Sequence, residues 1–310
     1  MTTVDIILCV YNAEDTLAEA IDSVLAQSYQ DFKLWIVNDG SPDNSQLIID
    51  RYATLDSRIS TLKHDNCGLG LSRNKAINAA IKQGAKYIAF IDADDVWLSD
   101  KLTLQMQAFA SHPEADIVVT DMIYYAESEN YTPPIKPSIK FEHIQNIFSI
   151  LCTRNFPFQP VTAVLKAYLF SDIAEFTSDK SGQDFYPFLK FAYADKNYFK
   201  VPLPLYRERQ LEGSLQRSPK SGLLSGTARK NASKRVLAEG IADNTITQEK
   251  AQLLKLAHDR FCSWMLSGAR KALPYRDSVK LALAQKTDFH SQTIFWRELG
   301  KSLLYPIAPK

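Results

Sequence analysis

The stretch Phe90–Trp97, FIDADDVW, holds the residues best suited to chemistry. Its carboxylates belong to Asp92, Asp94 and Asp95, and they directly follow the apolar run Tyr87–Ile91, which predicts a buried strand. Like charges this close repel one another, and burying them unpaired is costly. A divalent cation relieves that repulsion, and ligation by oxygen alone favours Mg²⁺ or Mn²⁺. We therefore predict a metal site here. The alternative is a solvated acidic turn that caps the following helix.

The strands and helices expected around these carboxylates alternate along the chain. Apolar runs predict strands at 4–10, 32–37, 59–62, 87–91 and 116–119, and helical spacing predicts helices at 14–26, 43–55, 71–83 and 101–111. This order predicts an α/β fold with a Rossmann-like, mostly parallel sheet flanked by helices. Ligands of such sheets bind beyond the carboxyl ends of the strands, so Asp39 and Asp92 are expected on one edge.

The second half of the chain is less regular. Residues 126–140 are expected to form a surface loop. Helices are expected at 141–152 and 183–195, with an extended edge segment at 198–206 that contains Pro202 and Pro204. Four more helices are expected at 220–240, 247–271, 275–287 and 291–304. We predict one domain at 1–213, made of halves at 1–120 and 121–213, followed by a helical region at 214–310.

The composition is that of an ordinary globular protein, with 310 residues, 45% hydrophobic and 23% charged. No run of 18 apolar residues predicts a transmembrane helix, and the first residues enter a strand without a basic signal-peptide region. The isolated cysteines suggest neither a zinc knuckle nor a disulfide framework, so we expect reduced thiols in a cytoplasmic protein. They are Cys9, Cys67, Cys152 and Cys262.

Two further motifs suggest contacts with a nucleotide. Asp39 ends the second predicted strand, where its carboxylate can accept hydrogen bonds from a base or ribose; the alternative is an ordinary Asx-turn. The segment Gly68–Asn74, GLGLSRN, lacks the third glycine of a dinucleotide-binding motif and follows the third strand rather than the first. Its functional interpretation is a loop at a helix N-terminus with Arg73 near a diphosphate. The alternative is a helix start with a surface arginine.

The order of these motifs resembles family 2 glycosyltransferases of the GT-A fold. The matching features are a VYN-type first strand, the Asp39-Gly40-Ser41 strand end, the GLGLSRN helix start and the FIDADD strand end. The resemblance is strong over residues 3–112, weaker over 160–217 and absent beyond. It implies a nucleotide-diphospho-sugar donor, usually a UDP-sugar, and inversion at the anomeric carbon. It also implies that residues 1–213 form the catalytic domain, with a nucleotide-sugar half at 1–120 and an acceptor half at 121–213.

Residue by residue, the resemblance implies these roles. Asp39 contacts the base, Asp92 the ribose or the metal shell, and Asp94 ligates Mn²⁺ or Mg²⁺ with Asp95 beside it. Tyr11 and Arg73 line the nucleotide site.

The segment Ser181–Tyr186, SGQDFY, resembles the family's G-E-D-x-x motif and implies Asp184 as the catalytic base. Gln183 stands where glutamate is usual, which weakens this assignment. The alternative for Asp184 is a carboxylate that stabilises the first turn of a helix. The segment Leu205–Gln210 resembles the family's Y-R segment and implies Arg207 near the donor phosphates. No Q-x-x-R-W motif is present, which disfavours a processive synthase.

These features predict metal-assisted, single-displacement transfer of a sugar to a saccharide or lipid-linked acceptor, in surface polysaccharide or glycolipid synthesis. Two alternatives remain open. A haloacid-dehalogenase-type phosphatase would use Asp92 as nucleophile in the D-x-D-x-V pattern. A noncatalytic protein would bind the sugar nucleotide only.

Charge divides the chain unevenly. Residues 1–213 carry 19 Lys and Arg against 28 Asp and Glu, whereas residues 214–310 carry 17 against 7. The basic region also has amphipathic helices. We expect these helices to pack on the catalytic domain or form a homodimer, or else to contact the inner face of an anionic membrane peripherally. No nucleic-acid partner is expected.

Overall fold

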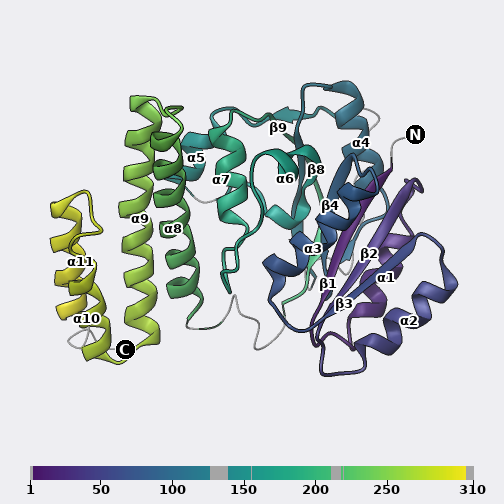
Figure 1. The fold of residues 1–310 in the computed structure, drawn as a ribbon, viewed down its shortest axis with the longest axis horizontal. Coiled ribbons are helices and arrows are strands. Elements are labelled where there is room, and N and C mark those ends of the chain that lie inside the picture. The colour runs from purple at the N-terminus through teal and green to yellow at the C-terminus, as the bar shows by residue number, and fades with distance from the viewer. Residues whose placement is uncertain (1–2, 126–138, 155, 211–217, 219, 305–310) are drawn as a thin grey trace. The chain divides into compact units, whose positions relative to one another are not determined.

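The computed structural model describes residues 3–125, 139–154, 156–210, 218 and 220–304 (Figure 1). The chain divides into two compact units. The α/β unit comprises Met1–Ile147, Phe156–Ser178 and Ala194–Gln210, and the helical unit comprises Phe148–Asn155, Asp179–Tyr193 and Leu211–Lys310.

The described residues of the α/β unit form one nine-stranded sheet, in the order β3-β2-β1-β4-β8-β6-β9-β5, with β7 paired to β9. Strands β3, β2, β1 and β4 run parallel, whereas β8 is antiparallel to both of its neighbours. This arrangement confirms the predicted α/β fold with a mostly parallel sheet. The strands are β1 Val4–Val10, β2 Phe32–Asp39, β3 Ile59–His64, β4 Tyr87–Asp92, β5 Val96–Trp97, β6 Ile117–Tyr124, β7 Glu142–His143, β8 Val164–Lys166 and β9 Tyr198–Glu208.

The central strand β1 is buried on both faces, since Ile6 and Leu8 on one face and Ile7 on the other are at most 1% exposed. Such a strand requires helices on both sides, because a parallel sheet is stable only when both faces are covered. The predicted helix at 101–111 coincides with the observed one, and that at 14–26 begins later, at Leu17. The helices of this unit are α1 Leu17–Leu25, α2 Ser45–Leu55, α3 Leu69–Lys82, α4 Lys101–Ser111 and α6 Tyr168–Asp172.

Two sequence predictions are wrong in detail. Residues 141–152 were expected to form one helix, but Glu142–His143 form β7 and the helix α5 spans only Ile147–Thr153. Pairing with β9 and stacking of His143 on Phe199, with ring centroids 4.8 Å apart, outweigh the local helical pattern.

The second wrong detail concerns β9, which is an interior strand rather than an edge. It pairs with β6 on one side and with β5 and β7 on the other. Proline has no N–H for a ladder hydrogen bond, and the β6–β9 register shifts beside Pro202 and Pro204. The predicted loop at 126–140 lies largely outside the described residues.

The helical unit contains the four C-terminal helices that the sequence predicted, together with α7 and nearly all of α5. Asp259 of α9 fixes the start of the last helix, since its carboxylate accepts hydrogen bonds from the N–H groups of His290 and Ser291. Among the described residues, no helix combines the length and apolar character needed to cross a bilayer. The helices are α7 Phe185–Tyr193, α8 Ser221–Ala242, α9 Gln248–Ala272, α10 Tyr275–Ala284 and α11 Gln292–Leu304.

Candidate functional site

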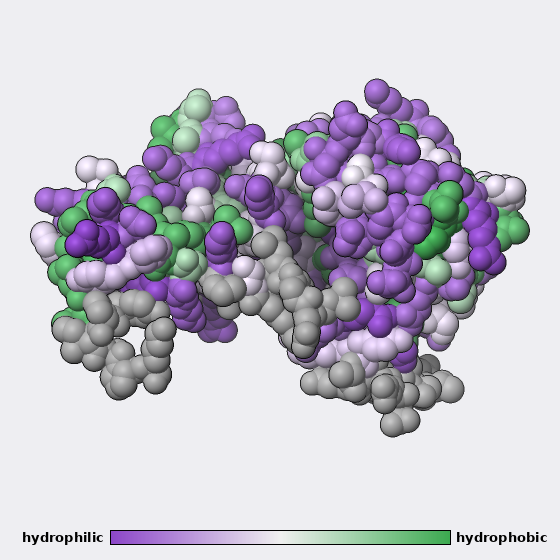
Figure 2. All heavy atoms as spheres, turned by 90° about the horizontal axis from the view of Figure 1, so that it is seen from below, coloured by the Kyte–Doolittle hydropathy of each residue, from purple (hydrophilic) through white to green (hydrophobic). Residues whose placement is uncertain are grey.

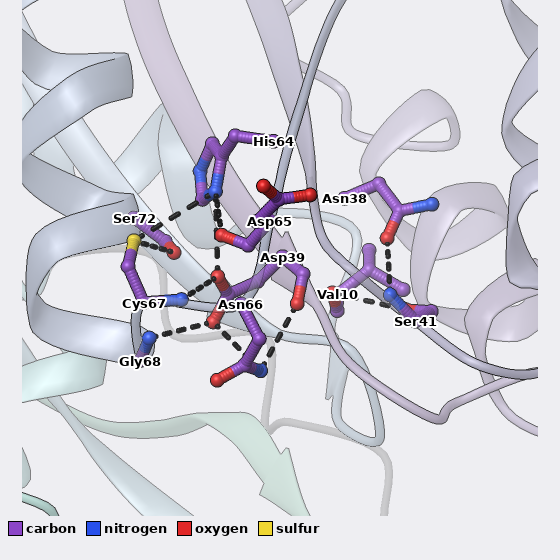
Figure 3. Close-up of polar contacts among 10 residues, drawn as sticks. All are labelled: Val10, Asn38, Asp39, Ser41, His64, Asp65, Asn66, Cys67, Gly68 and Ser72. Atoms are coloured by element: carbon purple, nitrogen blue, oxygen red, sulfur yellow. Dashed lines mark hydrogen bonds and ion pairs between the residues drawn. The ribbon is translucent and has the colours of Figure 1, made fainter.

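Asp39 lies at the carboxyl end of β2 and is almost fully buried. Its Oδ1 accepts a hydrogen bond from the Cys67 N–H at 2.7 Å, and its Oδ2 accepts one from the Gly68 N–H at 3.0 Å (Figure 3). The Asp39 side chain does not form the alternative Asx-turn. Its neighbour Asn38 forms the turn instead, since Asn38 Oδ1 accepts a hydrogen bond from the Ser41 N–H at 2.8 Å. The Asp39 carboxylate is thus held in place by backbone donors that immediately precede α3.

A second group of side chains gathers around the same carboxylate. His64 Nδ1 lies 3.4 Å from Asp39 Oδ1 and 3.7 Å from Cys67 Sγ (Figure 3). One potential ligand atom from each of the three residues lies within 4.8 Å of the other two. Sequence analysis missed this group because it judged the cysteines by their spacing. A usable signal was the strand ends, since Asp39 and His64 are paired residues of β2 and β3.

Arg73 links α3 to the end of β4. Its side chain is only 4% exposed, and Nη2 lies 2.6 Å from Asp92 Oδ1. The guanidinium carbon also lies 5.4 Å from the ring centroids of Phe90 and Phe176. The alternative of a surface arginine is therefore wrong. The structure brings Arg73 and Asp92 together as an ion pair at the sheet edge.

Asp94 and Asp95 lie in the turn between β4 and β5. Burial, followed by the charge of Asp92, raises the pKa of Asp94 to about 6. Burial, followed by the charges of Asp92 and Asp94, raises the pKa of Asp95 to about 8. A solvated capping turn is excluded, since Asp95 is buried and Asp100 occupies the N-cap position of α4. The turn holds carboxylates whose ionised forms a cation would stabilise.

The three carboxylates of this turn face different partners. Asp92 pairs with Arg73, whereas Asp95 accepts hydrogen bonds from the Tyr206 hydroxyl at 2.7 Å and the Arg209 N–H at 2.8 Å. Within the described part of the chain, three potential metal-ligand atoms come within 4.8 Å only at Asp39, His64 and Cys67. The acidic turn is therefore not a closed ligand set.

Two residues that contact the acidic turn, Tyr206 and Arg209, were not identified from the sequence. The buried Tyr206 hydroxyl also accepts the Asp92 N–H at 3.2 Å, and Arg209 Nε donates to the Asp94 carbonyl oxygen at 3.0 Å. Both come from β9 and the residue after it, more than 100 positions away in sequence. The motif analysis singled out only Arg207 there, which pairs with Val96 in the β5–β9 ladder.

Two predicted site residues remain, Tyr11 and Asp184, and they lie far apart in the sequence. Tyr11 follows β1 and is 56% exposed, so its ring is accessible to a ligand. Asp184 belongs to the helical unit and directly precedes α7, where the Phe188 N–H donates to its carbonyl oxygen at 3.4 Å. Burial lowers the pKa of Arg229 on α8 to about 10, and the Asp184 carboxylate opposes that shift.

The profile described as Glycosyl transferase family 2 matches residues 5–175. Glycosyltransferase GlyA of Streptococcus pneumoniae is 27% identical over 225 residues, which cover 69% of this chain and 31% of GlyA. EpsH of Bacillus subtilis is 29% identical over 323 residues, covering 99% of this chain and 88% of EpsH.

A third relative is described as the UDP-Glc:alpha-D-GlcNAc-diphosphoundecaprenol beta-1,3-glucosyltransferase WfaP of Escherichia coli. It is 33% identical over 147 residues, covering 44% of this chain and 57% of WfaP. The chain thus spans less than two thirds of both GlyA and WfaP.

Two solved structures share the fold. Residues 1–349 of S. aureus TarS, in complex with UDP-GlcNAc, align with a TM-score of 0.61 and 16% identity, over 97% of this chain and 91% of that one. The mannosyltransferase PcManGT of Pyrobaculum calidifontis, in complex with GDP-Man and Mn²⁺, aligns with a TM-score of 0.51 and 16% identity, over 97% and 86%. The likeness is one of fold.

Proposed function

Because this chain belongs to glycosyl transferase family 2, we propose that it transfers a sugar from a nucleotide-diphospho-sugar to an acceptor hydroxyl with inversion. The observation that carries the proposal is the carboxyl edge of the sheet. There a backbone-held Asp39 and the Arg73–Asp92 pair accompany the carboxylate turn of Asp94. Base, ribose and diphosphate of one donor need these three kinds of group.

In this proposal the donor is a UDP-sugar. The Asp39 carboxylate accepts a hydrogen bond from the base, and the exposed Tyr11 ring covers the nucleoside. Asp92 contacts the ribose while Arg73 holds its carboxylate in place. The name of WfaP, whose donor is UDP-Glc, supports a uridine donor, and TarS, which shares the fold, has been solved with UDP-GlcNAc.

The residues of the acidic turn fit a divalent cation. Mn²⁺ or Mg²⁺ prefers oxygen ligands and would be held by Asp94, with Asp92 and Asp95 beside it. When bound, the cation neutralises charge that develops on the departing diphosphate. Tyr206 and Arg209 act on the same turn through Asp95, because they fix both of its carboxylate oxygens. The Mn²⁺ complex of PcManGT supports this choice of cation.

The proposed chemistry is one displacement. The acceptor oxygen bonds to the anomeric carbon on the face opposite the phosphate, and its proton passes to the Asp184 carboxylate. The nucleoside diphosphate leaves with the bonding electron pair, and Arg207 or Arg73 offsets its charge. The inverted product follows because no enzyme nucleophile intervenes.

The acceptor is proposed to be a saccharide or a lipid-linked saccharide of surface polysaccharide or glycolipid synthesis. The name of WfaP, whose acceptor is a sugar on a lipid diphosphate, supports this class. The basic C-terminal helices would then let a cytoplasmic protein approach an anionic membrane face peripherally, or form a homodimer.

The deciding experiment incubates the full chain with UDP-, GDP- and dTDP-sugars plus Mn²⁺, and measures released nucleoside diphosphate and inorganic phosphate separately. We expect nucleoside diphosphate from one donor, none in EDTA, and none from Asp94→Ala. Exposed Asp65→Ala is the matched control. Release of inorganic phosphate alone indicates the phosphatase alternative. Binding of a donor without any release indicates the noncatalytic one. Full activity in chelator contradicts the assigned metal.

A further inference from the structure

We propose that Asp39, His64 and Cys67 form a second cation site, selective for a thiophilic divalent ion and best suited to Zn²⁺. The three side chains come from the ends of β2 and β3 and from the segment before α3, and they point toward one another (Figure 3). They lie in the α/β unit, and the proposal requires nothing from the helical unit.

The spacing of the ligand atoms matches tetrahedral zinc. With Zn–N and Zn–O bonds of about 2.0–2.1 Å and a Zn–S bond of about 2.3 Å, tetrahedral angles separate N from O by about 3.3 Å and N from S by about 3.6 Å. The corresponding distances are 3.4 Å from His64 Nδ1 to Asp39 Oδ1 and 3.7 Å to Cys67 Sγ. These two separations are within about 0.1 Å of the tetrahedral values.

The ligand types decide which ion is favoured. A thiolate, an imidazole and a carboxylate suit Zn²⁺, whereas Mg²⁺ and Mn²⁺ prefer oxygen ligands alone. The acidic turn at Asp94 offers only oxygen. The two sites would thus sort cations by chemistry, with the harder ion at Asp94 and the softer ion at Cys67.

The proton balance of binding is simple. In the metal-free protein His64 Nδ1 lies 2.9 Å from the Asp65 carbonyl oxygen, so it carries the proton that this hydrogen bond needs. To bind the ion, that nitrogen offers its lone pair and the imidazole proton moves to Nε2, leaving the ring neutral. The Cys67 thiol releases its proton to solvent and becomes a thiolate. Net binding releases one proton.

Neighbouring groups already orient the ligands. The N–H groups of Cys67 and Gly68 fix both oxygens of the Asp39 carboxylate, and Ser72 Oγ lies 3.6 Å from Cys67 Sγ. Gly68 has φ = +90°, a backbone conformation that suits glycine and turns the chain so that both amides face Asp39. Such surrounding hydrogen bonds support the affinity of metal sites.

A functional consequence rests on the proposed function. Asp39 Oδ1 is both a ligand of this site and part of the carboxylate proposed to contact the donor base. A Zn²⁺ ion and a nucleotide would therefore exclude one another, and Zn²⁺ would inhibit transfer by raising KM for the donor without changing kcat.

The site is tested with Co²⁺ as a spectroscopic stand-in for Zn²⁺, on the full chain with excess Mg²⁺ present to occupy the acidic turn. We expect a sulfur-to-cobalt charge-transfer band that Zn²⁺ abolishes. Cys67→Ser should lose the band, and His64→Gln should weaken binding at least about tenfold. Cys152→Ser, which removes a thiol from the helical unit, and His143→Gln, which removes an imidazole elsewhere in the α/β unit, should retain it. A band that persists in Cys67→Ser, or none in the wild type, overturns the site.

Competition is measured separately, by titrating UDP into the Co²⁺-loaded chain. Displacement of the band by UDP is expected, together with Zn²⁺ inhibition that Cys67→Ser relieves. A band that UDP leaves intact overturns the shared role of Asp39. The nucleoside diphosphate assay without Zn²⁺ reports on the proposed function independently, so the two failures are distinguishable.

Discussion

The two units of the molecule hold their elements together in different ways. In the α/β unit, strand ends and backbone N–H groups fix polar side chains, as the Cys67 and Gly68 amides fix Asp39. In the helical unit, α8 and α9 approach until their backbones touch. A Cβ atom on Gly226 would lie 2.6 Å from the Met265 nitrogen, and one on Gly268 2.1 Å from the Leu223 nitrogen.

This difference separates what each unit can tolerate. The α/β unit contains buried carboxylates with raised pKa values, such as Asp94 and Asp95, and keeping them ionised there lowers its stability. Such strain commonly marks a functional site. The helical unit buries an apolar cluster that includes Phe289, Phe295 and Leu299. The comparison suggests chemistry in the first unit and scaffolding in the second, with Asp184 as the proposed exception.

The largest expected effect tests that exception. Asp184→Asn is nearly isosteric but cannot take the acceptor proton, so kcat should fall at least about a hundredfold. Donor affinity, measured by calorimetry, should change little. Asp243→Asn, an exposed aspartate of the same unit, is the matched control and should behave as wild type. If Asp184→Asn turns over normally, Asp184 is not the base, and the helical unit contributes no catalytic residue to this proposal.

The next effect concerns the contact between α8 and α9. Gly268→Ala places a Cβ atom against backbone atoms of Gly222 and Leu223, so the helices must separate. Overpacking of this kind destabilises by about 1–3 kcal/mol. Gly300→Ala is the matched control, since no atom beyond its chain neighbours and its own helical backbone lies within 4 Å of its added Cβ. Because alanine favours helix, this control should stabilise by up to about 1 kcal/mol. Equal urea midpoints for the two variants would contradict backbone contact.

The sequence predicts different features in the α/β unit and in the helical unit. Asp39 and Asp92 could be placed on one edge, because the ends of parallel strands share an edge. Their partners could not all be found, since Tyr206 reaches the turn through a strand pairing over 100 residues distant. The helices after residue 220 were predicted from their apolar stripes. Their glycine contacts were not, because three-dimensional proximity of backbones leaves no periodic signal.

A smaller effect concerns pH. Burial, followed by the charges of Asp92 and Asp94, raises the pKa of Asp95 from its ordinary 3.8 to about 8 in the native state. Between these values the native state holds a proton that the unfolded state releases, so stability of the metal-free protein should fall as pH rises from about 4 to 8. Asp95→Asn cannot titrate, and its unfolding midpoint in EDTA should fall less steeply over that range. Exposed Asp15→Asn should keep the wild-type slope. Identical slopes for all three proteins would contradict the raised pKa.

The smallest effect concerns the basic helices at the C-terminal end of the described chain. On α10, Arg276, Lys280 and Leu283 follow one another at helical spacing, and all three are exposed. Leu283 is 52% exposed and Trp296 on α11 is 58% exposed. Figure 2 shows hydrophobic and hydrophilic residues interspersed on the visible face of the helical unit. An apolar and basic surface of this kind suits an anionic bilayer.

Each cation near such a bilayer contributes about 1 kcal/mol, which is about fivefold in affinity. We therefore expect Lys280→Gln to weaken co-sedimentation of the full chain with anionic vesicles about fivefold at low salt. Lys82→Gln removes the same charge from an exposed position at the end of α3 and should change little, because the surface contact is assigned to the helical unit. High salt should abolish the difference through screening. Equal weakening by both variants would instead indicate that net charge alone governs vesicle binding, and that the contact with the vesicle is not confined to the helical unit.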